Sequence, residues 1–215
     1  ILVLDTSSSM LAEDFKPNRL EAVKDAAKEF IANRDGDRIG LLVFGKDTFI
    51  QCPLTIDYGV LNSLLTEVTV MEPKYDGTAI GVAIANAVNR LRSAESKSKV
   101  IILLSDGSNN SGSIDPISSA KIAKQYGIKV YTIGAGTKQS ITKIPGRGFV
   151  RNEIDEETLK GIAKETNGKY FRATDKNSLS SIYSEIDELE NSEITVNYFS
   201  SYQEVYIWFI VIGFI

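Results

Sequence analysis

The sequence predicts a doubly wound α/β domain with a mostly parallel six-stranded sheet, one antiparallel edge strand and helices on both faces. Three observations predict this fold class. Along the 215 residues, short apolar runs alternate with amphipathic segments, as in folds whose strands alternate with helices. The apolar runs show no polar alternation, which is typical of strands buried on both faces of a parallel sheet. One further strand follows a tight turn, which makes it antiparallel to the strand before it.

The apolar runs predict where the strands lie along the chain. The antiparallel strand follows the turn Gly45-Lys46-Asp47 and contains the single cysteine, Cys52, which we expect to be a small buried side chain. A single cysteine also excludes an internal disulfide bond. In chain order, the strands are expected at residues 1–4, 39–44, 47–55, 100–104, 130–133 and near 170–171.

Five amphipathic helices are expected between and after these strands. Asn18 and Glu21 are spaced as a capping pair at the start of the first helix. Asp115-Pro116 offers an N-cap followed by the ring that is favoured at the first helical position. The polar composition of residues 137–154 predicts a surface loop. The apolar stripes of the helices run through residues 20–31, 80–91, 117–126, 159–163 and 179–189.

Histidine is absent from the sequence, and this excludes several classes of chemistry. Ser-His-Asp and Cys-His nucleophile systems need an imidazole base, and most zinc and copper sites need several histidine or cysteine ligands. A metal site in this chain must therefore hold a hard cation through oxygen, with Mg²⁺ as the first candidate and Mn²⁺ or Ca²⁺ as alternatives. The net charge of −4 argues against a nucleic-acid surface, which requires clustered basic residues.

The two ends of the chain differ in character from the rest. The chain starts in an apolar run without an initiator Met, so we expect this start to be a boundary within a longer protein. Residues 205–215 are apolar and uncharged, and Tyr202, Tyr206 and Trp208 resemble an interfacial aromatic belt. As a helix this segment spans only ~16 Å of a hydrocarbon core of roughly 30 Å. We expect a truncated transmembrane helix, with a buried C-terminal helix or strand as the alternative.

These features divide the chain into a domain at residues 1–190, a juxtamembrane linker at 191–204 and the start of a transmembrane helix at 205–215. The linker carries acidic residues and neither Lys nor Arg. The positive-inside rule then favours a domain outside the cytoplasm.

Oxygen-bearing side chains follow two of the strands and precede one helix. Residues 5–9 leave the first strand, Asp106 follows the strand that ends at Leu104, and Thr78 precedes a helix. Singly, each has a simpler explanation as a turn or helix-cap residue. Together they are expected beyond the carboxyl ends of the strands, where open α/β sheets bind their ligands. Two carboxylates and three hydroxyls then predict a Mg²⁺ site made of Asp5, Ser7, Ser9, Thr78 and Asp106.

The run Asp5-Thr6-Ser7-Ser8-Ser9 resembles the DxSxS signature of von Willebrand factor A domains. Thr78 and Asp106 stand where that family completes its metal-ion-dependent adhesion site. The likeness extends from Ile1 to about Glu190 and implies the Rossmann-like fold of that family. Several segments resemble more specifically the BatA-type proteins of bacterial aerotolerance operons. These segments are residues 9–20, 37–40, 76–81, 100–107 and 169–174.

This resemblance implies roles for the individual residues. Ser7, Ser9 and Thr78 would bind Mg²⁺ directly, while Asp5 and Asp106 would act largely through water. Ser8 departs from the family pattern, in which glycine is frequent at this position. Because Ser8 does not occupy a ligand position, we expect the site to tolerate the change.

The resemblance also implies a function, namely metal-dependent binding of another protein. One open coordination position suits a carboxylate from the partner. The family context implies the bacterial inner (cytoplasmic) membrane with the domain in the periplasm, and partners among sibling Bat-type proteins and a MoxR-type ATPase system. Rim residues are expected to set partner choice, and the candidates are Phe15, Tyr75, Ser108, Asn109 and Asn110.

Two alternatives compete with this interpretation. The first keeps the fold without the metal and makes the domain a structural scaffold of a membrane complex. The second is a Mg²⁺-dependent phosphohydrolase, but such enzymes need a second aspartate where this chain has Ser7. A GxxxxGK[ST] loop is absent, and Gly134-Ala135-Gly136 lacks the third glycine of a dinucleotide fingerprint. The sequence therefore favours a binding domain over an enzyme.

Overall fold

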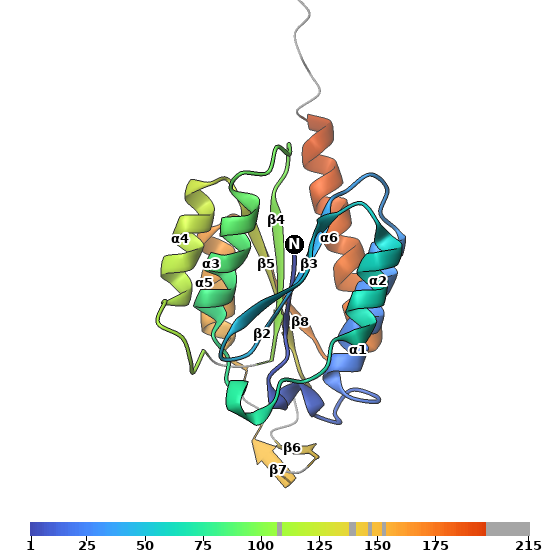
Figure 1. The fold of residues 1–215 in the computed structure, drawn as a ribbon, viewed down its shortest axis with the longest axis vertical. Coiled ribbons are helices and arrows are strands. Elements are labelled where there is room, and N and C mark those ends of the chain that lie inside the picture. The colour runs from blue at the N-terminus through green and yellow to red at the C-terminus, as the bar shows by residue number, and fades with distance from the viewer. Residues whose placement is uncertain (107–108, 138–140, 146–147, 152–153, 197–215) are drawn as a thin grey trace, which may run out of the picture.

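The computed structural model describes residues 1–106, 109–137, 141–145, 148–151 and 154–196, and they form a three-layer α/β sandwich. One six-stranded sheet forms the middle layer. Helices α1, α2 and α6 cover one face, and α3, α4 and α5 cover the other (Figure 1). The helices are α1 (Arg19–Ala32), α2 (Tyr58–Glu67), α3 (Ile80–Leu91), α4 (Pro116–Gln125), α5 (Glu156–Glu165) and α6 (Lys176–Val196).

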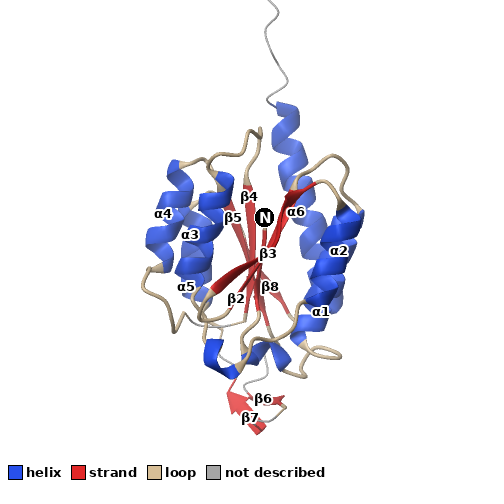
Figure 2. Ribbon diagram, viewed as in Figure 1, coloured by secondary structure: helices blue, strands red, loops and turns tan. Residues whose placement is uncertain are grey.

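The sheet lies between the two layers of helices (Figure 2), and its strand order is β3-β2-β1-β4-β5-β8. All neighbouring pairs are parallel except β2 and β3, and β3 lies at the edge. The predicted fold class is therefore confirmed, including its one antiparallel edge strand. The strands are β1 (Leu2–Asp5), β2 (Ile39–Phe44), β3 (Thr48–Thr55), β4 (Val100–Ser105), β5 (Lys129–Ala135) and β8 (Tyr170–Ala173).

Both faces of the central strand β1 are buried, as the unbroken apolar run predicts. Leu2 and Leu4 point into the core beneath α1, α2 and α6, whereas Val3 points into the core beneath α3, α4 and α5. Side chains alternate between the faces of a strand, so a strand between two helical layers needs apolar residues at every position. Cys52 is buried, as expected.

The structure contains local elements that the sequence analysis did not identify. Helix α2 was missed, and part of the segment predicted as a loop at residues 137–154 forms a two-stranded hairpin, β6 (Ile141–Ile144) and β7 (Gly148–Arg151). Short 3₁₀ turns, η1 (Ser8–Leu11) and η2 (Pro73–Tyr75), lie in the loops after β1 and before α3. Helix α6 continues past Glu190 to Val196, into the segment predicted as a linker.

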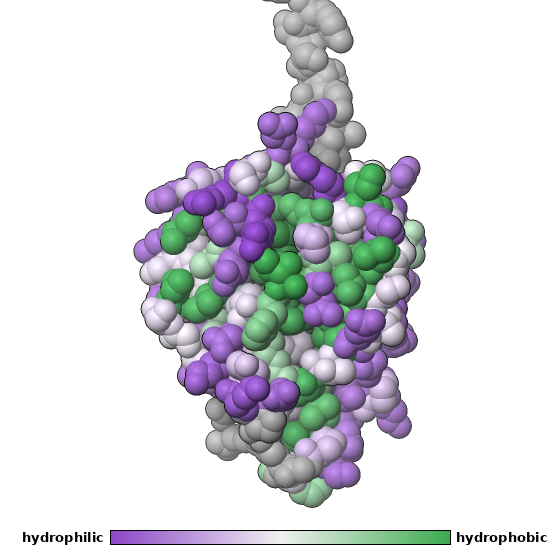
Figure 3. All heavy atoms as spheres, viewed as in Figure 1, coloured by the Kyte–Doolittle hydropathy of each residue, from purple (hydrophilic) through white to green (hydrophobic). Residues whose placement is uncertain are grey.

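The edge strand β3 carries apolar side chains that are partly open to solvent. Phe49 and Ile50 are 44% and 43% exposed, and Figure 3 shows apolar side chains gathered over the middle of the face that β3 crosses. Pro53 lies within this strand and has no backbone N–H to offer. A proline on an edge strand limits pairing with a further strand.

The start of the described chain and the end of α6 lie at the same edge of the sheet, where the parallel strands begin (Figure 1). The loops after β1 and β4 and before α3 lie at the opposite edge. Within the described residues, none of the helices combines the length and the apolar character needed to cross a bilayer. The predicted transmembrane segment at 205–215 lies outside the described residues.

Candidate metal centre

The first loop of the site begins at the last residue of β1. Asp5 is fully buried, and its two carboxylate oxygens accept different donors. The backbone N–H of Ser7 donates to Asp5 Oδ1 at 2.9 Å, and the hydroxyl of Ser105 donates to Asp5 Oδ2 at 2.6 Å. Ser105 is the last residue of β4, next to β1 in the sheet. Asp5 therefore joins the carboxyl ends of the two central strands.

The two predicted serine ligands form a hydrogen-bonded chain that ends on Asp106. Ser9 Oγ donates to Asp106 Oδ1 at 2.8 Å, and the Ser7 and Ser9 oxygens lie 2.9 Å apart. A hydroxyl has a single proton, and Ser9 gives its own to Asp106, so Ser7 is the donor in the contact between the serines. These bonds fix the direction of both hydroxyl groups.

The loop that precedes α3 is tied to the first loop through Asp76. Its carboxylate accepts the Ser8 backbone N–H at Oδ1 and the Ser8 hydroxyl at Oδ2, both at 2.9 Å. Gly77 follows with φ of +137°, and a side chain there would collide with the Ser111 hydroxyl, so glycine is required for the turn to Thr78. Ser8 is therefore a residue that connects two loops.

The same loop is tied to the segment after β4 by two asparagines. The Thr78 backbone N–H donates to Asn110 Oδ1 and the Ile80 backbone N–H donates to Asn109 Oδ1, each at 2.9 Å. These bonds occupy backbone donors at the start of α3, where Ala79 offers no capping side chain. The three loops are thus connected pairwise by hydrogen bonds.

Thr78 does not act as a helix cap. It is only 3% exposed, and its hydroxyl makes no hydrogen bond with any part of the chain that the structure describes. The Thr78 oxygen is therefore available to a ligand.

An arginine that the sequence analysis did not single out binds Asp106 from the side of α1. Arg19 is 2% exposed, and its Nη1 donates to Asp106 Oδ2. Its Nε and Nη2 donate to the two oxygens of Asp14 at 2.8 and 2.7 Å. Asp14, Asp106 and Asp5 together carry three negative charges against the one positive charge of Arg19. These four groups leave two negative charges when all are ionised.

Burial dominates the electrostatics of the two predicted carboxylates. The desolvation of Asp5, reinforced by the nearby Asp106 carboxylate, raises the pKa of Asp5 to about 7, although Ser105 and Ser7 donate to it. Burial likewise raises the pKa of Asp106, because the opposing effects of Arg19 and Ser9 are smaller. Without a further cation, the fold thus disfavours the ionised form of both groups.

The donor set fits a hard divalent cation. It offers hydroxyl and carboxylate oxygens, which suit Mg²⁺, Mn²⁺ or Ca²⁺, and a cation of charge two would balance the excess negative charge. Among the described residues, no three acidic or cysteine side chains form a metal-binding group. This fits a site in which hydroxyls supply the majority of the ligands. Asp5, Ser7, Ser9 and Asp106 are joined by contacts, and Thr78 is on the loop tied to them.

The prediction that Phe15 lies on the rim of the site was wrong. Phe15 is 2% exposed and packs in the core beneath α1, so it is not available to a partner. Asn109 and Asn110 do lie in the site loops, where their side chains hold the start of α3. Tyr75 is partly exposed and packs its ring edge-on against Phe49. Ser108 lies outside the described residues.

The sequence analysis also missed Asp14, Arg19, Asp76 and Ser105 as parts of the site. Arg19 had a detectable signal, since it lies beside the apolar stripe of α1, where a charged residue is buried only with a partner. Ser105 precedes Asp106 directly. The roles of Asp14 and Asp76 depend on loop geometry, which spacing along the chain does not reveal.

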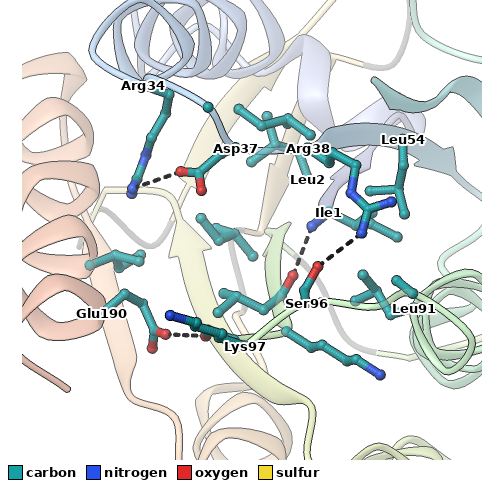
Figure 4. Close-up of a pocket in the computed structure, with 18 of the residues that line it drawn as sticks. Ile1, Leu2, Arg34, Asp37, Arg38, Leu54, Leu91, Ser96, Lys97 and Glu190 are labelled. Carbon is teal, nitrogen blue, oxygen red and sulfur yellow. Dashed lines mark hydrogen bonds and ion pairs between the residues drawn. The ribbon is translucent and has the colours of Figure 1, made fainter. Parts of the chain in front are cut away.

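A cavity with a volume of about 400 Å³ lies at the opposite edge of the sheet (Figure 4). Ile1 and Leu2 line it together with charged residues from the loops before β2 and β4. Those charges have protein partners: Arg34 pairs with Asp37, and Arg38 donates to Ser96.

Comparison with known proteins adds independent information. Residues 1–185 match the family model of the von Willebrand factor type A domain. An uncharacterized protein of Borreliella burgdorferi is 30% identical over all of this chain, which spans 65% of that protein's length.

Two solved structures are similar over nearly the whole domain. An aerotolerance-related membrane protein from Bacteroides fragilis has a TM-score of 0.79 and 32% identity, covering 89% of this chain and 97% of that one. BatB from Bacteroides thetaiotaomicron has a TM-score of 0.78 and 30% identity, covering 88% and 97%.

Proposed function

This chain belongs to the von Willebrand factor type A family, and from this premise we propose that it is a metal-dependent protein-binding domain. The carboxyl edge of its sheet holds a divalent cation, and a carboxylate of the partner protein completes the coordination. One observation carries the proposal. Three loops are tied pairwise around two buried carboxylates, and the hydroxyl of Thr78, on one of these loops, has no hydrogen bond within the described chain.

Each residue has a defined role in this proposal. The hydroxyls of Ser7, Ser9 and Thr78 bind the cation, while Asp5 and Asp106 orient the serines and hold bound water. Ser9 donates its proton to Asp106 and accepts one from Ser7, which leaves one Ser9 lone pair for the metal. Mg²⁺ is the expected ion, with Mn²⁺ and Ca²⁺ as alternatives, because all the donors are oxygen.

The same chemistry explains why a partner carboxylate would bind. Neutral hydroxyl ligands leave much of the charge of the ion unbalanced, and a hard cation prefers an anionic oxygen in its open position. The site also lies at the edge opposite the chain start and the end of α6 (Figure 1). A chain that continues into a membrane from that end would present the metal centre away from the bilayer.

The cellular setting is likewise a proposal. We place the protein at the bacterial inner membrane with the domain in the periplasm, in an aerotolerance-related complex. This rests on the likeness to a solved structure described as an aerotolerance-related membrane protein. Sibling Bat-type proteins and a MoxR-type ATPase system are the expected partners. We propose a binding role rather than a catalytic one, because the sequence has no histidine base and no GxxxxGK[ST] phosphate-binding loop.

Calorimetric titration of Mg²⁺ or Mn²⁺ into the purified chain tests the metal site. We expect binding of one ion, lost in Thr78→Ala and retained in Ser8→Ala, since Ser8 keeps its backbone bond to Asp76. Thr78→Ala is a clean test because its hydroxyl has no bond to lose within the described chain. Equal heats from wild-type protein and Thr78→Ala would contradict the ligand assignment, and no heat at all would favour the metal-free scaffold.

A second experiment tests partner binding. The intact membrane protein is captured from solubilised membranes with Mg²⁺, with a chelator, and as the Thr78→Ala variant. We expect a specific partner in the first condition and its loss in the other two. Retention of the same partner in all three conditions would contradict a role for the metal.

A further inference from the structure

Arg19 connects the metal centre to a separate structural unit. It lies at the start of α1, and the three nitrogens of its guanidinium donate to two carboxylates on different loops. Asp14 takes two of these donors in a bidentate pair, and Asp106 takes the third. Both ion pairs are almost fully buried, with side chains at most 2% exposed. Buried pairs of this kind depend strongly on geometry, because neither charge has water as an alternative.

Asp14 extends this connection to the hairpin β6–β7. Its Oδ2 also accepts the backbone N–H of Thr137 at 3.0 Å and the Thr137 hydroxyl at 3.2 Å. Thr137 lies in the loop that leaves β5 toward the hairpin. The hairpin itself contacts the loop after η1, where the Glu13 backbone N–H donates to the Lys143 carbonyl at 3.2 Å. It also buries Ile144 to 4% exposure.

We propose that Arg19 is the positioning residue of the metal centre, acting through Asp106, and that its ion pair with Asp14 couples the bound cation to the hairpin. This inference rests on the proposed metal site. Arg19 holds Asp106 Oδ2, so Oδ1 faces Ser9 and aligns that hydroxyl for the ion. A cation that fixes Asp106 then also fixes Arg19, Asp14 and Thr137, which precedes the hairpin.

Lysine cannot replace Arg19 in this role. A guanidinium presents a planar fork that binds one carboxylate through two atoms and still has a third donor for another. A single ammonium nitrogen on a flexible stem lacks that geometry. Arg19→Lys therefore keeps the charge of the site and removes the alignment.

The hairpin places apolar surface next to the metal centre. Ile141 and Phe149 are 59% and 80% exposed, and Figure 1 shows the hairpin beyond the loops that carry the site. Strand β6 packs against η1, the turn that contains Ser9. A partner whose carboxylate reaches the metal would therefore lie within reach of the hairpin.

Manganese titration of the purified chain tests the positioning role. We expect Arg19→Lys to bind Mn²⁺ about 10–100-fold more weakly, the loss typical for residues that orient metal ligands. Arg34→Lys is the matched control, since Arg34 follows the same helix and forms ion pairs with Asp37 and Asp187 at the other edge. It should leave the affinity unchanged. Urea unfolding of each variant identifies any that do not fold.

Amide hydrogen exchange tests the coupling. In the wild-type protein, saturating Mg²⁺ should slow exchange several-fold at residues 141–144 and 148–151. Asp14→Asn weakens the ion pair with Arg19 and should abolish that slowing. The exchange rates of the β5 amides should stay as they are in the wild-type protein. A fold defect alone would affect both sets of amides.

The outcomes separate this inference from the proposed function. Tight Mn²⁺ binding by wild type with equal binding by Arg19→Lys would overturn the positioning role and leave the metal site intact. The coupling would be overturned if Mg²⁺ did not change the exchange rates of the hairpin amides in the wild-type protein. It would also be overturned if Mg²⁺ slowed them equally in Asp14→Asn. Absence of Mn²⁺ binding in wild type would overturn the metal site and this inference together.

Discussion

Asp5 and Asp106 at one edge of the sheet and Glu190 at the other are all buried, yet their pKa values shift in opposite directions. At the carboxyl edge, burial raises the pKa of Asp5 and of Asp106. At the amino edge, Glu190 is only 7% exposed, and burial alone would raise its pKa as well. Hydrogen bonds from Tyr131, Ser98 and Lys129 outweigh burial there and leave the pKa of Glu190 below its ordinary value.

The difference lies in the number of donors for each charge. Glu190 accepts Tyr131 Oη at 2.6 Å, Ser98 Oγ at 2.7 Å and the Lys129 ammonium at 3.1 Å. One carboxylate thus has a cation and two hydroxyls. At the carboxyl edge, Arg19 serves both Asp106 and Asp14. Asp5 has a hydroxyl and a backbone N–H among the described residues, without a cation of its own.

This comparison distinguishes a structural carboxylate from one prepared for a ligand. A buried charge with a complete set of donors stabilises the fold, whereas a buried charge without a counterion destabilises it. A cation bound beside such a charge would remove this cost. The predictions below test this distinction.

Replacing Asp5 should give the largest effect on metal binding and no loss of metal-free stability. Asp5→Asn removes the buried charge while retaining its shape, so we expect loss of measurable Mg²⁺ binding by calorimetry. The free energy of unfolding without metal should stay equal or rise, since a desolvated carboxylate is removed. A large loss of metal-free stability would show that Asp5 is a structural residue like Glu190.

Replacing Glu190 should have the reverse effect. Glu190→Ala leaves the Lys129 ammonium without its buried partner, and we expect a loss of about 3 kcal/mol in the free energy of unfolding. Mg²⁺ affinity should not change. Glu165→Ala is the control, because Glu165 pairs with Lys124 at the surface and should cost at most about 1 kcal/mol. Urea unfolding measures the stability of both variants. A weaker Mg²⁺ affinity in Glu190→Ala would show that the two edges do not act independently.

The two edges should also respond oppositely to pH. The folded pKa of Asp5 is about 7, above its ordinary value of 3.8, so metal-free stability should fall as the pH rises between these values. Saturating Mg²⁺ should remove this decline. The pKa of Glu190 is lowered, so its contribution is present above its ordinary pKa of 4.5 and is lost as the pH falls through the folded value. Unfolding curves over this pH range, with and without Mg²⁺, check both signs.

The smallest expected effect concerns the capping of α3. Asn110→Ala removes the bond to the Thr78 backbone N–H, which should cost about 1 kcal/mol of stability and weaken Mg²⁺ binding by a few-fold. Asp155→Ala removes a comparable bond, to the Thr158 N–H at the start of α5, and should cost a similar amount without changing the affinity. Equal affinities of the two variants for Mg²⁺ would show that Thr78 does not need the asparagine.

The sequence predicted the regular elements well because buried parallel strands and amphipathic helices have strong periodic signals. Strand β2 and helix α3 have the predicted bounds. Helix α2 was missed, since only Leu61 and Leu65 are buried and its apolar stripe is therefore weak. The hairpin β6–β7 was predicted as a loop because exposed residues such as Ile141 and Phe149 reflect local pairing rather than a core.

Prediction of the site was less complete. Asp5 and Asp106 could be assigned to one edge because parallel strands end together. The hydrogen bonds that join the loops could not be predicted, since Asp76 meets Ser8 and Asp14 meets Thr137 only after the chain has folded. Phe15 was predicted to lie on the rim, but it packs inward. Position along the chain does not determine the direction of a loop side chain.

The most direct test is the free energy of unfolding of the wild-type chain with and without saturating Mg²⁺, at a pH above the Asp5 pKa of about 7. If a cation completes the charge at the carboxyl edge, Mg²⁺ at a hundred times its dissociation constant should stabilise the fold by about 2.7 kcal/mol. The same addition should leave Asp5→Asn unchanged. No stabilisation of wild type, or equal stabilisation of the variant, would contradict the metal centre.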